Sequence, residues 1–375
     1  MAQINKTSLT VGQSVTGQDL TVPVFTVTGD LDGPNVYIQA NMHGAEIQGN
    51  AVIFQLLNQL ASLEIRGKIT LVPHANPLGG NQKSGEYTMG RFDPLTGENY
   101  NRMYYNNMDF IPEFVEQNID VEDSVVRQRF KAILRQQLAE ALDSPFGLKS
   151  GQQISYALQQ MAVEADYVLD LHTGPNSSHH LYVAEYFLDA AQYFNIPHVL
   201  VIPNGFDGAL DEACFVPWWT LSDAFAAKGR VFAAHTEAYT VELGSQESIS
   251  LAQAEQDTQS LLSYLCHKEM FAEAQFTPAK MTRYGCYLKD FKTIYSPHGG
   301  LAEYHGVHGE ILPAGAPLAN LLRMDRYTCD GLGQQNALTT VSLPQAVIPI
   351  LNCASGSVQQ GTELYKVFYN FFELS

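Results

Sequence analysis

Two residues three positions apart, His43 and Glu46, form a pair that could hold a metal ion. An apolar, β-branched run from Val36 to Ile38 precedes them and predicts a buried strand. Apolar residues at helical spacing follow, up to Leu57, and predict a helix. The pair therefore lies at a strand-to-helix turn, where open α/β folds place their chemistry. Because histidine nitrogen and carboxylate oxygen are both good zinc donors, we expect a metal site here.

A single His-x-x-Glu pair also arises by chance in a chain with 11 histidines and 39 acidic residues. A metal site therefore needs a third ligand. His172 ends another predicted strand, in the sequence Asp170-Leu171-His172. Residues two apart in a strand share a face, so Asp170 and His172 point the same way. We expect His172 to bind the metal and Asp170 to hold the ring of His43, because ligating histidines commonly have a carboxylate partner. The alternative is a hydrogen-bonded histidine without a metal.

Glu242 ends a third predicted strand, Val241-Glu242-Leu243-Gly244. An acidic side chain inside an apolar strand is costly unless it is paired or functional, although a solvent-facing position is an equal alternative. Burial would raise its pKa toward the neutral range, where a general base works best. His43, Glu46 and His172 would then form a zinc site with a position left for water. Glu242 would take the proton from that water as it attacks a carbonyl.

A long segment with little periodicity covers residues 74–112. Loops of this length inside a compact domain tend to be functional. The segment contains Arg91 and the pair Asn101-Arg102, and arginine binds carboxylates through a planar fork. Two arginines in one polar loop are notable in so acidic a chain, and the alternative is ordinary surface ion pairing. We expect them to be candidates for stabilising an oxyanion or binding a substrate.

The elements needed to position these residues alternate between strands and helices, which indicates an α/β domain. Strands within residues 7–40 form a hairpin that leads into the run before His43. Further strands are expected over 68–73, 165–172, 198–203 and 230–243, and helices over 123–143, 154–164, 218–227 and 250–272.

The composition changes near Phe276. From there on, short apolar runs alternate with Gly, Pro and Asp, and no helix is predicted. Strands are expected within 301–325, 338–350 and 364–372. We therefore divide the chain into a catalytic domain, residues 1–276, and a smaller β-rich module, residues 277–375.

The chain has 375 residues and a net charge of -18, which argues against binding to nucleic acid or to an anionic membrane surface. Its five cysteines are scattered and include no Cys-x-x-Cys pair, as expected for reduced residues of a cytoplasmic protein. We see no apolar leader at the N-terminus and no stretch long enough to span a membrane. A homo-oligomer is compatible with this composition.

Other candidate residues have simpler interpretations. The pair His179-His180 follows two serines and is expected in a surface loop, and His305-x-x-His308 is expected in a glycine-rich turn. Trp218 and Trp219 are expected in the core or in a pocket wall. Ser245 and Ser248 lack a base partner for a serine hydrolase.

Taken in order, these motifs resemble the succinylglutamate desuccinylase/aspartoacylase family of zinc-carboxypeptidase-like hydrolases. The resemblance rests on His43-x-x-Glu46, Asn76-Pro77, the loop with Arg91 and Asn101-Arg102, Asp170 to Thr173, and Glu242-Leu243-Gly244. It covers roughly residues 30 to 250, and the β-rich tail is similar to that family's C-terminal module. One departure is Asn99, which stands where the family usually has aspartate.

The resemblance implies a mixed β-sheet with helices on both faces, followed by a barrel-like β module. It implies one zinc ion per chain, on His43, Glu46 and His172. Glu242 would act as base and then as acid, and Arg91 would polarise the scissile carbonyl. Asn101 and Arg102 would bind the free carboxylate of the substrate.

The resulting hypothesis is a zinc amidohydrolase that releases the acyl group of a small N-acyl amino acid. Two alternatives remain. The first is a zinc carboxypeptidase acting on peptides with the same ligands, and the second is a binding protein on the same fold without catalytic activity.

Overall fold

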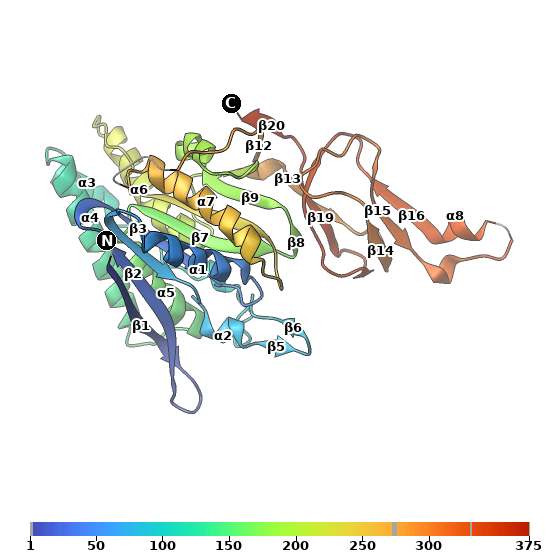
Figure 1. Ribbon diagram of the computed structural model, residues 1–375, viewed down its shortest axis with the longest axis horizontal. Helices are drawn as coiled ribbons and strands as arrows, with labels where there is room; N and C mark the ends of the chain where they lie inside the picture. Colours follow the sequence, from blue (N-terminus) through green and yellow to red (C-terminus); the bar gives the residue numbers. More distant parts are fainter. Residues whose placement is uncertain (1–2, 272–275, 331, 375) are drawn as a thin grey trace.

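A ten-stranded mixed β-sheet forms the centre of the protein in the computed structural model, which describes residues 3–271, 276–330 and 332–374 (Figure 1). Within these residues the strand order is β1-β2-β4-β3-β7-β11-β9-β10-β12-β20. The bounds are β1 (Gln3–Gln13), β2 (Asp19–Thr28), β3 (Leu31–Ala40), β4 (Arg66–Val72), β7 (Tyr167–Gly174), β9 (His179–Ala184), β10 (His198–Ile202), β11 (Glu237–Ser245), β12 (Arg283–Tyr287) and β20 (Phe372–Leu374).

The middle of this sheet is parallel. β3 pairs in parallel with β4 and β7, and β7 pairs in parallel with β11. β9 then runs antiparallel to β11, which makes the sheet mixed. Because parallel strands end at the same edge, the carboxyl ends of β3, β7 and β11 come together there.

Helices cover both faces of the sheet, as expected (Figure 1). α1 and α7 pack together on one face, and α3 to α6 lie on the other. Residues of β7 are buried at nearly every position, because both of its faces are covered. The bounds are α1 (Gln48–Leu60), α3 (Ile111–Asn118), α4 (Asp123–Leu142), α5 (Ser150–Ala162), α6 (Leu210–Ala227) and α7 (Leu251–His267).

The helix expected over 218–227 is longer than predicted. α6 begins at Leu210 and contains Pro217, a residue that usually disrupts a helix interior. Its first turn is stabilised by Glu212, whose carboxylate accepts a hydrogen bond of 3.2 Å from the backbone N–H of Ala209. α7 ends at His267, and residue 272, the predicted end of that helix, lies outside the described residues.

The long loop holds only short elements, in agreement with its lack of periodicity. These are α2 (Pro77–Gly80), β5 (Lys83–Ser84), β6 (Tyr87–Thr88) and a 3-10 turn (Tyr100–Arg102).

The C-terminal part is mostly β-structure and extends away from the large sheet (Figure 1). One four-stranded sheet has the order β13-β19-β17-β8 and another has the order β16-β15-β14-β18. Their bounds are β8 (Asn176–Ser177), β13 (Phe291–Tyr295), β14 (Gly300–Tyr304), β15 (Pro317–Leu322), β16 (Leu338–Ser342), β17 (Ile348–Asn352), β18 (Ser357–Val358) and β19 (Glu363–Phe368).

The expectation that this part contains no helix is wrong, because α8 (Gly333–Ala337) forms one short turn of helix. The barrel-like closure of the module and the boundary between residues 276 and 277 stay predictions. The two parts share sheets, since β12 and β20 belong to the large sheet and β8 pairs with β17 of the module. Among the described helices, none is long and apolar enough to cross a membrane.

Candidate functional site

The turn after β3 places His43 and Glu46 at the carboxyl edge of the sheet. The side-chain amide of Asn41 donates hydrogen bonds to the carbonyl oxygens of His43 (2.9 Å) and Gly44 (3.1 Å), which fixes the turn. A Cβ atom on Gly44 would lie 2.1 Å from the carbonyl oxygen of Gly79, so only glycine fits between this turn and the long loop. The backbone packing of these glycines holds the loop against the site.

Glu46 lies between the two histidines. Its Oε1 is 2.8 Å from Nδ1 of His43, and its Oε2 is 2.8 Å from Nδ1 of His172. Arg91 donates to Oε1 at 2.9 Å, and the backbone N–H of Thr173 donates to Oε2 at 3.1 Å. The structure thus brings together the three predicted metal ligands, and their donor atoms all lie within 4.8 Å of one another.

The protonation of this cluster follows from burial and charge. Burial lowers the pKa of His43, although the neighbouring Glu46 carboxylate opposes this shift. Burial disfavours the ionised form of Glu46, but His43 and Arg91 outweigh it and hold the pKa of that carboxyl well below its usual range. Burial also disfavours a charged His172, while Asp170 and Glu46 raise its pKa well above the ordinary value.

The hydrogen bonding of His43 fits a bound cation. Its Nε2 lies 2.8 Å from Oδ1 of Asn99, an oxygen that also accepts from the backbone N–H of Asn101 at 2.8 Å. The neutral ring therefore carries its proton on Nε2 and turns the lone pair of Nδ1 toward the carboxylate of Glu46. Two electron-rich groups in this arrangement need a positive charge between them, so a divalent cation suits the group.

Asp170 has a different partner from the predicted one. Its Oδ2 lies 2.9 Å from Nε2 of His172, and its Oδ1 accepts a hydrogen bond of 2.9 Å from the side-chain amide of Gln39. The expectation that it holds the ring of His43 is therefore wrong. Asp170 and His172 project from the same face of one strand, which makes His172 the nearer ring, whereas Asn99 contacts His43.

Glu242 on β11 is the register partner of His172 on β7. The Oε2 atom of Glu242 is buried and has no hydrogen-bond partner among the described residues. Burial, followed by the negative charge of Glu46, raises the pKa of Glu242 to about 7, although His172 and Arg91 partly offset the shift. A carboxyl group with this pKa can exchange protons near neutral pH.

The three loop residues lie around this centre at different depths. Arg91 contacts Glu46 with 40% of its side chain exposed. Asn101 is buried, and its side-chain nitrogen lies 3.2 Å from Nε2 of His172. Arg102 is more exposed, at 47%, and its Nε lies 3.3 Å from a carboxylate oxygen of Asp207. Arg91 and Asn101 thus touch the predicted ligands directly, whereas Arg102 lies further out.

A cavity of about 430 Å³ opens onto these residues, and both parts of the chain line it. Sequence reasoning missed Tyr182 on β9, the buried Asp211 at the start of α6, and Lys366 on β19, all of which face the cavity. Burial, then Glu212 and Asp170, raise the pKa of Asp211 to about 7. Asp211 was missed because the helix was expected to begin only at residue 218, and the other two depend on contacts between distant segments.

The expected surface position of His179-His180 is wrong. Both residues belong to β9, and His180 is fully buried, with Nδ1 3.0 Å from the carbonyl oxygen of Ser178. Burial lowers the pKa of His180 to about 3, so it stays neutral. Trp218 lies in the core, as expected, and residues 305–308 form no helix or strand.

The fold agrees with comparisons to known proteins. A family model described as succinylglutamate desuccinylase/aspartoacylase catalytic domain matches residues 32–268. A succinylglutamate desuccinylase/aspartoacylase family protein from Shewanella amazonensis is 48% identical, with a TM-score of 0.95, over 99% of this chain and 100% of that one. A similar protein from Shewanella frigidimarina is also 48% identical, with a TM-score of 0.95, over 100% of this chain and 99% of its own. A comparison with curated proteins gave no match.

A more distant structure shows the same fold. The succinylglutamate desuccinylase/aspartoacylase from Rhodobacter sphaeroides is 16% identical, with a TM-score of 0.65, over 98% of this chain and 96% of that one. A large mixed sheet with helices on both faces and a buried His–Glu–His group at its edge thus define an α/β protein with a candidate metal centre. The chain belongs to the succinylglutamate desuccinylase/aspartoacylase family.

Proposed function

We propose that the protein is a zinc-dependent amidohydrolase that removes the acyl group from a small N-acyl amino acid. One observation carries this proposal. The buried group of His43, Glu46 and His172 opens onto the same cavity as Glu242, a carboxyl group with a pKa of about 7. Metal ligands and a titratable base beside one cavity are the parts that metal-assisted hydrolysis needs.

His43, Glu46 and His172 would hold one zinc ion per chain. When bound, zinc supplies Lewis acidity, which makes water a better nucleophile and polarises a carbonyl group. Asn99 and Asp170 orient the two rings. Asn99 accepts a hydrogen bond from Nε2 of His43, and a carboxylate oxygen of Asp170 lies 2.9 Å from Nε2 of His172.

Glu242 would accept a proton from the attacking water at its Oε2 atom, which has no other partner among the described residues. The same carboxyl group would then return the proton to the leaving amine nitrogen, as required when an amide bond breaks. Burial and the negative charge of Glu46 favour both steps, because together they raise the pKa of the group to about 7.

Arg91 would stabilise the charge that develops on the carbonyl oxygen, since its guanidinium lines the cavity and donates to Glu46 at 2.9 Å. Asn101 and Arg102 would bind the free carboxylate of the amino acid. Because Arg102 lies 3.3 Å from the exposed Asp207, this role requires that the substrate carboxylate compete with Asp207 for the guanidinium.

A small substrate is favoured over a peptide by the shape of the cavity. Its volume of about 430 Å³ suits a small molecule, and Leu288, Phe291 and Lys366 of the C-terminal part close one side of it. An extended peptide would need space beyond this wall.

The test is a substrate screen with the zinc-loaded full chain. N-acetyl and N-succinyl amino acids are compared with peptides of several residues, and the released amine is measured. We expect amine release from the acylated single amino acids and its loss in Glu242→Gln. Faster release from the peptides would favour a carboxypeptidase, and no release from either with zinc bound would favour a binding protein.

A further inference from the structure

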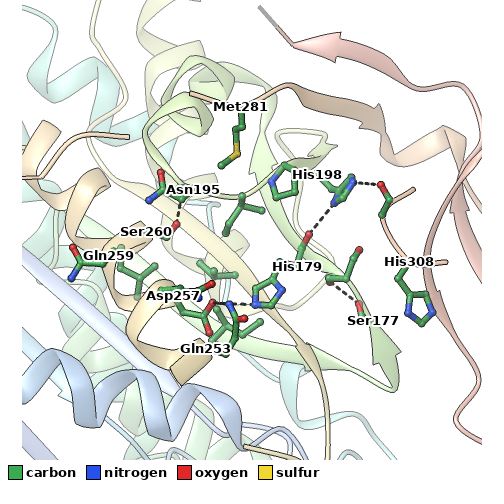
Figure 2. Close-up of a pocket in the computed structure, with 18 of the residues that line it drawn as sticks. Ser177, His179, Asn195, His198, Gln253, Asp257, Gln259, Ser260, Met281 and His308 are labelled. Atoms are coloured by element: carbon green, nitrogen blue, oxygen red, sulfur yellow. Dashed lines mark hydrogen bonds and ion pairs between the residues drawn. The ribbon is translucent and has the colours of Figure 1, made fainter. Parts of the chain in front are cut away.

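A second cavity, larger than the catalytic one, lies on the opposite face of β9 and β11. Figure 2 shows the residues that line it. Its volume is about 750 Å³, compared with about 430 Å³ for the catalytic cavity. Val241 and Leu243 line it, whereas Thr240 and Glu242 line the catalytic cavity. Because successive residues of a strand face opposite sides, one strand separates the two cavities.

A buried carboxylate faces this second cavity. The side chain of Asp257 on α7 is only 4% exposed, and its Oδ1 lies 3.0 Å from Nε2 of His179. Gln253 donates to the same oxygen at 3.0 Å, and Gln48 donates to Oδ2 at 3.2 Å. Figure 2 shows the Asp257 carboxylate beside the ring of His179. A carboxylate has about four acceptor positions, so these three contacts leave one for a ligand.

The charge of the lining selects the kind of ligand. Asp257 and Glu310 are acidic, and no lysine or arginine lines the cavity within the part of the chain that the structure describes. Uncharged polar side chains such as Asn195, Gln256 and Ser260 make up much of the remaining wall. An anion would meet the negative charge of Asp257 and Glu310 here, whereas an ammonium group would find a buried carboxylate with a free acceptor position.

The cavity also joins the two parts of the chain. His198 on β10 lies with Nδ1 3.2 Å from the carbonyl oxygen of His179 and Nε2 3.0 Å from that of Gly309 (Figure 2). Gly309 has φ +81°, and a Cβ atom there would lie 2.7 Å from Cε1 of His198, so the turn packs closely on the ring. This turn, with His308 and Glu310, forms one wall of the cavity.

We propose that this second cavity is a binding site for a small polar molecule that carries an amine. Its ammonium group binds Asp257, and its remaining polar groups reach the turn at residues 308–310. A ligand in this position bridges α7 and the C-terminal part, which also lines the catalytic cavity through Lys366. Any effect of the ligand on hydrolysis rests on the proposed function, but its binding does not.

The experiment measures binding to the full chain by isothermal titration calorimetry. The probes are glycinamide and 1,4-diaminobutane, with succinate and glycerol as anionic and neutral comparisons. We expect saturable binding of the two amines only, with one molecule bound per chain. Asp257→Asn should weaken it about ten- to a hundredfold, as the loss of a charge-assisted hydrogen bond predicts. Glu255→Gln is the matched control, because Glu255 is exposed on the same helix and does not line the cavity.

Two further variants keep the test decisive. Glu310→Gln changes an exposed residue on the opposite wall, so it tests the site even if Asp257→Asn fails to fold. It should weaken amine binding by a smaller factor. Glu242→Gln alters only the catalytic cavity and should leave binding unchanged. The proposal is overturned if the amines do not bind or if succinate binds as tightly as they do. It is also overturned if Glu310→Gln and any folded Asp257→Asn bind the amines like the unmodified chain, or if Glu242→Gln abolishes amine binding.

Discussion

Glu242 and His172 are register partners on the adjacent parallel strands β11 and β7, and their side chains face the same cavity. The sheet therefore sets the separation of the proposed base from the candidate metal centre, and no mobile loop is needed to bring them together. Rigid strands are a precise way to hold catalytic groups.

Replacing Glu242 by Gln should abolish most of the hydrolysis without removing the metal. Glutamine keeps the shape of the side chain but cannot accept a proton, so we expect kcat to fall by about 10²- to 10⁴-fold. Zinc content and the thermal midpoint should stay close to those of the unmodified chain. Activity is followed by amine release, and zinc by elemental analysis. Glu255→Gln, an exposed residue, serves as control. Near-normal turnover in Glu242→Gln would rule out the proposed base.

The pH dependence of kcat/KM should reflect the same carboxyl group. The pKa of Glu242 is raised to about 7 by burial and by Glu46, and a bound divalent cation would lower it. A base must be deprotonated, so activity should be full at high pH and should decline as the pH falls through this pKa, at or below pH 7. The decline should be absent from any residual activity of Glu242→Gln. A profile that is identical in the two proteins would assign the titration to another group.

Asp170→Asn should weaken zinc binding. The carboxylate lies 2.9 Å from Nε2 of His172 and orients the ring, and loss of such a partner typically costs about 10- to 100-fold in metal affinity. Equilibrium dialysis against zinc measures the effect. Asn99→Ala provides a comparison, because Asn99 orients the other ring. Unchanged affinity in both variants would mean that the rings are held by packing alone.

The clustering of the three candidate metal ligands could be predicted from the sequence because their positions follow from local patterns. His43 follows one apolar run and His172 ends another, and both runs are plainly strands. Parallel strands bring their carboxyl ends to one edge of the sheet. The partner of Asp170 could not be predicted in the same way. It depends on the hydrogen bond between Asn99 and His43, and Asn99 lies in a loop with no periodicity.

The burial of His180 could not be predicted from the sequence, for a different reason. Two serines before it suggested a surface loop, yet β9 is inserted between β10 and β11, and His180 is fully buried. A strand of six residues gives too weak a pattern to reveal its partners. Lys366 was missed for a similar reason, since only the packing of the C-terminal part brings β19 to the cavity. Contacts of this kind depend on the tertiary fold and not on local sequence.

Arg102→Ala should impair recognition of the substrate carboxylate. A lost charge-assisted hydrogen bond costs about 1.5–3 kcal/mol, so kcat/KM for an N-acyl amino acid should fall about ten- to a hundredfold. The same acyl amino acid converted to its carboxamide should be affected far less, because it lacks the charge that Arg102 would bind. Arg135→Ala is the control, since Arg135 forms an exposed ion pair with Glu164. Equal losses on both substrates would show that Arg102 acts through the fold of the loop.

Gly44→Ala should disrupt the site through packing alone. The added Cβ would lie 2.1 Å from the carbonyl oxygen of Gly79, so the turn that carries His43 would have to separate from the loop. Overpacking of this kind costs about 1–3 kcal/mol, which a lower thermal midpoint would report, and zinc affinity should fall with it. Gly80→Ala is the matched control, because its Cβ would meet nothing closer than 3.9 Å. If both variants melted and bound zinc alike, the contact between the turn and the loop would not be what positions His43.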